Sequence, residues 1–386
     1  MFRSLWEIMP VLALVVGASV QANEIAQRGE SMQQAQSMEQ MCGIPEGENC
    51  CMARGCSNGN GFVVEVDFLW WRAENVGFSF AYEQKDPTYL TNTALPLINH
   101  NNGSVIRLDS MWKPGFRVGA GWNSWYDRWD FFCDYTWYQN HSAKTRTVAP
   151  NVNVLVGYFP QWPVFPDLLL AFAEGLPIAA FQRVHGSWKI QFNCVDAELG
   201  RAYYITKQFS LRPHWGARGA WINQRFTDNF NLPQPAPVLI AELDFYGENN
   251  WWGAGPRLGV WGDLNLGYGF SIVGKTSVSL LYGQTKTKYC NDFREFFSTE
   301  FIDAVRFHDQ FWQLVPNLQI FFGLEWGGGM HCDQVWFGID AGWEANCWWN
   351  QYNIPAVLFG STAPGPTNAS QPLTMEGLTV NAHLDF

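Results

Sequence analysis

The chain has 386 residues, of which 16% are aromatic, with 21 Trp and 29 Phe, and only 15% are charged. Its mean hydropathy of −0.15 is too low for a helical membrane protein, and so many Trp with so little charge are unusual in a soluble enzyme. The net charge of −11 argues against a nucleic-acid partner, which selects clustered Lys and Arg.

Residues 1–22 have the pattern of a secretory signal peptide. Arg3 precedes an apolar stretch from Ile8 to Val20, and small residues follow as far as Ala22, where we expect cleavage. The apolar stretch is too short for a membrane-spanning helix, which needs about 20 apolar residues. We therefore expect an exported protein that is either soluble or an outer-membrane β-barrel of a Gram-negative cell.

Residues 23–60 form a segment without strand periodicity, rich in Gln and Met and then in Cys, which we expect in the periplasm. Its cysteines are Cys42, Cys50, Cys51 and Cys56. Zinc is disfavoured because paired C-x2-C spacing and a nearby His are missing, so disulfides are the favoured hypothesis. The nine cysteines of the chain are an odd number, which leaves at least one thiol free or bonded to another chain. For Cys133, on an apolar strand face, we expect an unpaired small hydrophobe.

Strand patterns begin near Gly61 and continue to the last residue. Apolar or aromatic side chains occupy alternate positions, and small, polar or charged ones lie between them, as one face and the other of a strand require. The final strand ends with Leu384 and Phe386 on its apolar row, the C-terminal signal of barrels handled by the assembly machinery. A soluble sandwich can also end in such a strand.

Strand length and Trp placement favour a membrane barrel over a sandwich. Segments such as 187–206 and 251–270 exceed the usual length of a soluble strand, about 5–6 residues. Trp residues gather at strand ends, as in interfacial girdles. We predict an all-β transmembrane antiparallel barrel of about twelve strands (range 10–16) over residues 61–386. Long insertions are expected at 141–185, 226–250, 289–309 and 350–373.

The same alternation predicts which charges face the lumen, because a charge on the lipid side costs about 2–4 kcal/mol near the bilayer centre. With the apolar row facing lipid, the inward residues are Arg117, Arg218, Arg257, Asp263, Glu325, Asp340 and Glu344. Opposed arginines and carboxylates would order water and filter solutes in a pore. The alternative is structural pairing that plugs a narrow barrel.

No catalytic, metal or cofactor site is predicted. The glycines of 253–259 resemble a dinucleotide fingerprint only superficially, because Pro256 interrupts it and no βαβ unit surrounds it. The seven His are scattered, and neither His214 nor His383 is linked by the sequence to a particular Ser. We expect a protein that is not an enzyme.

Several segments resemble the Legionella-type major outer membrane protein family, which also occurs in chlamydia-like bacteria. The matching segments, in family order, are Glu65–Glu74, Asp196–Arg201, Phe209–Pro213, Gly216–Gln224, Trp252–Gly259, Ser279–Gly283, Ala341–Glu344 and Gly377–Phe386. The resemblance implies an outer-membrane barrel that conducts small solutes. It does not extend to the Cys-rich segment.

The predicted function is therefore a porin for passive diffusion of small hydrophilic solutes through a charged lumen. The alternative is a structural, disulfide-linked envelope protein or an adhesin with a blocked barrel. The expected partners are outer-membrane lipid and lipopolysaccharide and the barrel-assembly machinery. Disulfide-linked envelope proteins and a homo-oligomer are further candidates.

Overall fold

A computed structural model describes residues 61–75, 79–84, 103–124, 129–148, 157–160, 181–232, 240–295, 300–330, 335–352, 355–357, 366–368 and 371–386. The predicted signal peptide (1–22) and the Gln/Met- and Cys-rich segment (23–60) lie outside these residues. The same holds for the disulfide candidates Cys42, Cys50, Cys51 and Cys56.

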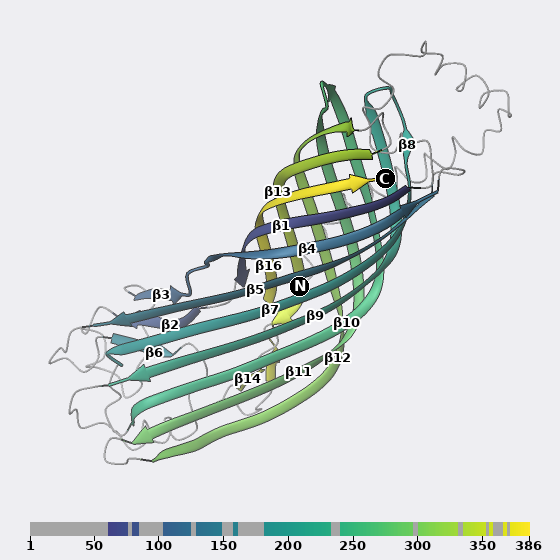
Figure 1. Cartoon of the computed structure of the whole chain (residues 1–386). Coiled ribbons are helices and arrows are strands. Elements are labelled where there is room, and N and C mark those ends of the chain that lie inside the picture. Colours follow the sequence, from purple (N-terminus) through teal and green to yellow (C-terminus); the bar gives the residue numbers. More distant parts are fainter. Residues whose placement is uncertain are drawn as a thin grey trace, which may run out of the picture. The chain divides into compact units, whose positions relative to one another are not determined.

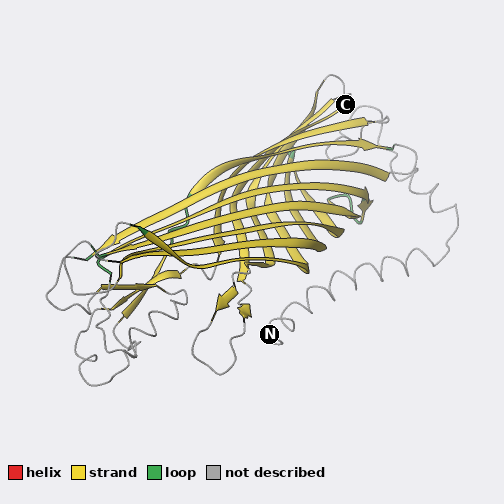
Figure 2. Cartoon of the chain, turned by 90° about the horizontal axis from the view of Figure 1, so that it is seen from below, coloured by secondary structure: helices red, strands yellow, loops and turns green. Residues whose placement is uncertain are grey.

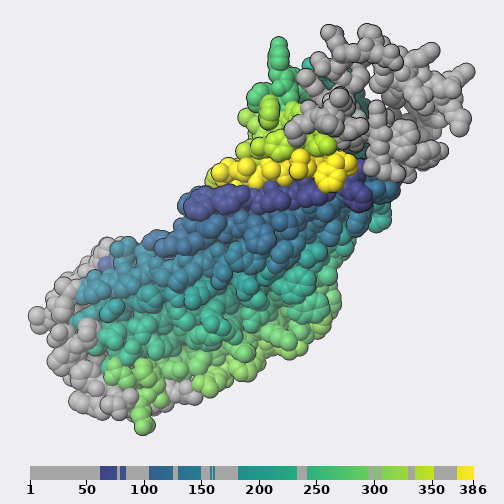
Figure 3. Space-filling view, viewed as in Figure 1, coloured from purple at the N-terminus to yellow at the C-terminus, as the bar shows by residue number. Residues whose placement is uncertain are grey.

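Ten of the described strands form a closed antiparallel barrel in which strands consecutive around the barrel are also consecutive along the chain. They are β1 (Gly61–Asn75), β4 (Trp112–Asn123), β5 (Trp129–Thr147), β7 (Arg183–Arg201), β9 (Phe209–Asn231), β10 (Ile240–Gly267), β11 (Phe270–Glu295), β12 (Phe301–Met330), β13 (Val335–Tyr352) and β16 (Gln371–Asp385). The last strand closes the barrel against the first, as the adjoining yellow and purple surfaces show (Figure 1, Figure 3).

The expected number of about twelve barrel strands is not confirmed, because the barrel closes with ten. Outside it, β2 (Ser79–Gln84), β3 (Gly103–Arg107) and β6 (Gly157–Pro160) form a small sheet of their own, β14 (Pro355–Val357) pairs with β15 (Pro366–Asn368), and β8 (Tyr203–Tyr204) pairs only with β9. These strands are shorter than the 9–11 residues or so that cross a bilayer.

Two predicted insertions are mostly strand. Within 226–250, β9 continues to Asn231 and β10 starts at Ile240; within 289–309, β11 continues to Glu295 and β12 starts at Phe301. The apolar row that marks a lipid-facing strand stops earlier, since the outward side chains there are polar. The outward apolar row therefore ends in the sequence before the strands end, and these segments are predicted to be insertions because that row is missing.

The two ends of the barrel differ in their connections. The end that holds Gly61 and Phe386 has short connections, among them a two-residue turn in which Tyr268 and Gly269 both have positive φ, 55° and 81°. This is the left-handed conformation of a type I′ hairpin turn. The long connections, with β2, β3, β6, β14 and β15, lie at the other end (Figure 2). Outer-membrane barrels place short turns in the periplasm and long loops outside the cell.

The outer surface carries the predicted apolar row. On β1, Phe62 and Phe68 are 61% and 51% exposed, whereas Asp67 between them is 4% exposed. Exposed aromatic rings occur at two levels, with others such as Phe116 and Phe322 between them. They are Phe62, Trp122, Phe131, Phe270, Trp326 and Phe386 near the short turns, and Trp70, Trp112, Trp221, Trp252, Tyr282 and Trp312 near the long loops.

On β11 the distance between the two aromatic levels matches a bilayer. Phe270 and Tyr282 lie twelve positions apart on β11, about 40 Å along a strand and about 28 Å along the membrane normal at a tilt of about 45°. No helix among the described residues is long and apolar enough to cross a membrane.

Strands β5, β7, β9, β10, β11 and β12 extend beyond the others at the long-loop end and form a tall wall (Figure 1). The β2–β3–β6 sheet packs there: Phe80 and Ile106 belong to the same buried cluster as Val184 and Phe230 of the wall. Gly186 of β7 admits the Phe80 ring, because a Cβ at that position would lie 2.8 Å from it.

Candidate functional site in the barrel interior

All seven residues predicted to face inward share the inward parity of their strands. Arg218, Arg257, Glu325, Asp340 and Glu344 are buried, with 1–7% of their surface exposed. The Arg117 side chain is 14% exposed, and Asp263 is half-buried. Their role as pore-lining groups stays a prediction.

Arg117 of β4 joins carboxylates from two other strands. Its Nη1 lies 2.8 Å from Asp67 Oδ2 on the adjacent β1, and its Nη2 lies 2.7 Å from Glu344 Oε1 on β13. Since β1 and β16 separate β4 from β13 in the barrel wall, the Arg117–Glu344 pair crosses the interior rather than following the sheet.

A second cluster lies on the other side of the interior. Arg218 of β9 donates two hydrogen bonds to Asp196 of β7, at 2.7 and 2.6 Å. Arg257 of β10 approaches the same carboxylate at 2.9 Å. Each arginine is thus paired with an anion in a region that is largely withdrawn from water.

Gln319 of β12 connects the two clusters. It donates a 2.6 Å hydrogen bond to Glu344 Oε1 and accepts one from Arg218. Hydrogen bonds and ion pairs therefore run continuously across the lumen from Arg117 to Asp196. We call the connected set Asp67, Arg117, Asp196, Arg218, Arg257, Gln319 and Glu344 the charged belt.

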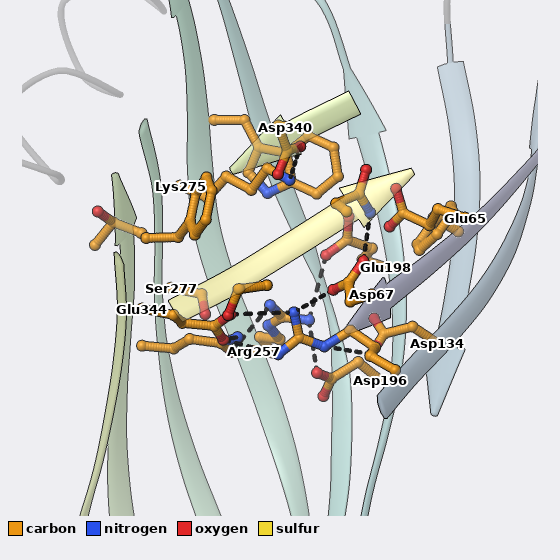
Figure 4. Close-up of a pocket in the computed structure, with 18 residues that line it drawn as sticks. Glu65, Asp67, Asp134, Asp196, Glu198, Arg257, Lys275, Ser277, Asp340 and Glu344 are labelled. Carbon is orange, nitrogen blue, oxygen red and sulfur yellow. Dashed lines mark hydrogen bonds and ion pairs between the residues drawn. The ribbon is translucent and has the colours of Figure 1, made fainter. Parts of the chain in front are cut away.

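A cavity of about 50 Å³ lies beside the charged belt (Figure 4). Because one water needs about 10–15 Å³, the cavity has room for a few waters. Its ionisable lining consists of Glu65, Asp67, Asp134, Asp196, Glu198, Asp340 and Glu344 against Arg117, Arg257 and Lys275. Seven carboxylates face three cations, and Lys275 pairs with Asp340 at 3.2 Å.

An aromatic layer crosses the lumen on the long-loop side of the charged belt. Phe192 lies four residues from Asp196 on β7, and Trp348 lies four residues from Glu344 on β13. The Phe192 and Trp348 ring centroids are 5.6 Å apart, and Trp251 of β10 lies 5.9 Å from Trp348. All three rings are buried, so side chains occlude the lumen at this level.

The two histidines considered for nucleophilic chemistry have carboxylate neighbours. His214 Nε2 lies 3.2 Å from Glu198 Oε2, and His383 Nε2 lies 3.5 Å from Glu325 Oε1. Within the part of the chain that the structure describes, no group of three or more His, Cys, Asp or Glu could hold a metal ion. Of the four described cysteines, all unpaired, Cys133 is exposed on the outer face and Cys194 is buried.

Sequence reasoning missed several members of this site. Asp67, Asp134 and Asp196 have the same parity as the predicted residues, so the alternation could have identified them. The Trp residues at strand ends, among them the adjacent pairs at 70–71 and 251–252, were predicted to form interfacial girdles. The structure divides each pair: Trp70 and Trp252 are exposed outside, whereas Trp71 and Trp251 are buried inside.

Comparison with known proteins gives one family. The profile of the family described as the Legionella pneumophila major outer membrane protein precursor matches residues 56–386. No curated protein sequence matches the chain significantly.

Similar solved structures are distant. The outer-membrane protease OmpT of Escherichia coli has 6% identity and a TM-score of 0.37, with 84% of this chain and 96% of that chain covered. A FadL homologue of Pseudomonas aeruginosa has 9% identity and a TM-score of 0.27, with 85% and 90% covered. The CymD monoaromatic hydrocarbon channel has 7% identity and a TM-score of 0.28, with 85% and 88% covered. At these TM-scores none of them informs the function.

Proposed function

The chain belongs to the family of the Legionella pneumophila major outer membrane protein, and we propose that it is a passive pore for small hydrophilic solutes rather than an enzyme. It is an outer-membrane protein with a closed antiparallel β-barrel. The proposal concerns what passes through that barrel.

The observation that carries the proposal is the charged interior with a cavity beside it. Ion pairs that cross the interior, such as Arg117 of β4 with Glu344 of β13, hold opposite charges on non-adjacent strands beside a cavity large enough for water. A transverse field of this kind orders water and discriminates between solutes by charge and size. The excess of carboxylates around the cavity favours cations over anions of equal size.

The aromatic layer sets the size limit of the proposed pore. Barrels of about eight strands are filled by their side chains, and aqueous channels are typical of 16–18 strands. A ten-stranded barrel with touching Phe192 and Trp348 rings therefore passes ions and very small solutes, and does so when these side chains rotate. The proposed conductance is low.

Liposome swelling with solutes of graded size tests this proposal. The purified barrel in phosphatidylcholine vesicles should admit the smallest neutral solutes and exclude disaccharides. Vesicles made with heat-unfolded protein provide the background. Equal swelling with and without folded protein, for every solute, would contradict a pore function.

A closed structural barrel is the second candidate, and the contact between Phe192 and Trp348 across the lumen favours it. In this case the Cys-rich segment would link the barrel to other envelope proteins through disulfides. Gels of whole envelopes, run with and without reductant, test the link. Higher-mass forms that collapse on reduction would support it, and an unchanged monomer would exclude it.

A further inference from the structure

On the tall wall, the aromatic level near the long loops marks the edge of the membrane. The height of other outward side chains above the membrane can be measured from this level. Trp221 of β9 pairs in register with Trp252 of β10. On the next strands, Trp252 and Tyr282 contact Trp312 at centroid distances of 5.8 and 5.2 Å. These rings are 43–56% exposed on the outer face, as expected for an interfacial girdle.

Cationic side chains lie just beyond this boundary on the same face. Arg225 follows Trp221 by four positions, Lys286 follows Tyr282 by four, and Lys288 follows it by six. Lys189 of β7 is in register with Arg225. We call Lys189, Arg225, Lys286 and Lys288 the cationic patch.

Among the described residues in register with members of the cationic patch, Glu248 is the one carboxylate. Glu248 of β10 is in register with both Arg225 and Lys288, and it lies 2.5 and 3.8 Å from their side-chain nitrogens. Lys189 and Lys286 are exposed and form no ion pair with a described residue. Four cations against one anion leave a local charge of +3 on a chain whose net charge is −11.

The height of the patch corresponds to the lipid headgroups. Four residues span about 13 Å along a strand, and a tilt of about 45° reduces this to about 9 Å along the membrane normal. Long Lys and Arg side chains can reach several ångströms back towards the membrane. The patch thus lies where the phosphate groups of the outer leaflet are found.

The opposite side of the barrel is different at this level. Arg72 of β1 is paired with Glu376 of β16, and it lies 3.3 Å from Glu74. Its charge is therefore compensated within the protein. On the patch side, His141 of β5 lies in register with Lys189, and the pKa of His141 is lowered by desolvation and by the nearby Lys189.

We propose that the cationic patch binds the phosphate groups of an outer-leaflet glycolipid of the lipid A type, on the β7–β11 side of the barrel. Charge complementarity selects the ligand: several cations on adjacent strands match a headgroup with more than one phosphate. Glu248 holds Arg225 and Lys288 in place, and its negative charge limits the affinity of the patch for phosphate groups. This inference rests on the outer-membrane location and is independent of pore activity.

Binding of bisphosphorylated lipid A to the folded full-length protein in dodecyl maltoside micelles tests the proposal, with dephosphorylated lipid A as the matched ligand. The variant Lys189→Gln/Lys286→Gln removes two cations that support no ion pair. At about a factor of five for each cation, its affinity should fall about 25-fold. Millimolar inorganic phosphate should not displace the lipid.

Two further variants make the result specific. Arg72→Gln/Lys207→Gln removes the same charge away from the patch, since Arg72 lies on β1 and Lys207 in the exposed turn between β8 and β9, and it should leave the affinity unchanged. Glu248→Gln removes the carboxylate and should raise the affinity about fivefold, so it tests the idea even if the double variant folds poorly. The proposal would be overturned if the wild type and both patch variants bound bisphosphorylated lipid A with equal affinity. It would also be overturned if the wild type bound dephosphorylated lipid A equally well, or if inorganic phosphate displaced the lipid.

Discussion

The rings of Phe192 and Trp348 lie 5.6 Å apart although their strands, β7 and β13, are on opposite sides of the ten-stranded barrel. Five strand positions separate them in either direction around the wall. The two rings therefore reach across the lumen and meet in its interior. This contact blocks the middle of the lumen, and it relates the fold directly to the proposed low conductance.

Phe192→Ala should widen the lumen, because it removes one ring of this contact without altering a charge. We expect larger solutes to enter in the swelling assay, and a loss of about 3–5 kcal/mol of stability from the cavity. Trp343→Ala is the control, since Trp343 lies on β13 but faces outward with 49% exposure. Equal permeability of the two variants would show that the ring contact does not limit passage.

Arg117→Met should destabilise the barrel strongly, because it leaves the carboxylates of Asp67 and Glu344 buried without their main cation. The expected loss is about 3–5 kcal/mol in the free energy of unfolding, measured by denaturant titration in detergent. Arg225→Gln removes an ion pair whose arginine is 57% exposed, and it should cost about 0–1 kcal/mol. Similar losses in both variants would refute the structural importance of the charged belt.

Gly216 and Gly219 on β9 should respond differently to alanine. A Cβ at Gly216 would lie 1.9 Å from the Ala197 carbonyl oxygen, whereas at Gly219 the nearest atom is 3.8 Å away on the Trp221 ring. Gly216→Ala therefore requires the backbones of β7 and β9 to separate. We expect a lower unfolding midpoint for Gly216→Ala only, and equal midpoints would contradict the close strand approach.

Deletion of Phe386 should impair assembly. Its backbone exchanges two hydrogen bonds with Phe62, at 2.7 and 3.0 Å, at the seam where β16 meets β1, and its ring is 52% exposed on the outer face. The amount of heat-modifiable barrel in the membrane fraction measures the effect. Phe386→Tyr retains an aromatic C-terminus and should assemble normally. An undiminished barrel after deletion would exclude the signal role.

The sequence was sufficient to predict the two faces of each strand. Alternation has the same period in the sequence and in the sheet, so the outward row of Phe62 and Phe68 and the inward position of Arg117 follow from parity alone. The final strand with Phe386 was predicted for the same reason. Each of these assignments depends only on neighbours within one strand.

The interior layers could not be predicted in this way. Which residues meet across the lumen depends on the register between all ten strands, and alternation contains no information about it. Phe192 and Trp348 are remote in sequence and share no motif. The expected number of about twelve strands (range 10–16) is not confirmed for a related reason. The segments β2, β3 and β6 look like strands locally, and only their pairing excludes them from the ten-stranded barrel.

Single-channel recording in planar lipid bilayers tests the pore proposal most directly. Folded wild-type protein should give discrete conductance steps of small amplitude, with a reversal potential in a salt gradient that indicates a preference for cations. Phe192→Ala should give larger steps under the same conditions. If neither protein produces steps, while both are heat-modifiable and therefore folded, the barrel is closed and the pore proposal is wrong.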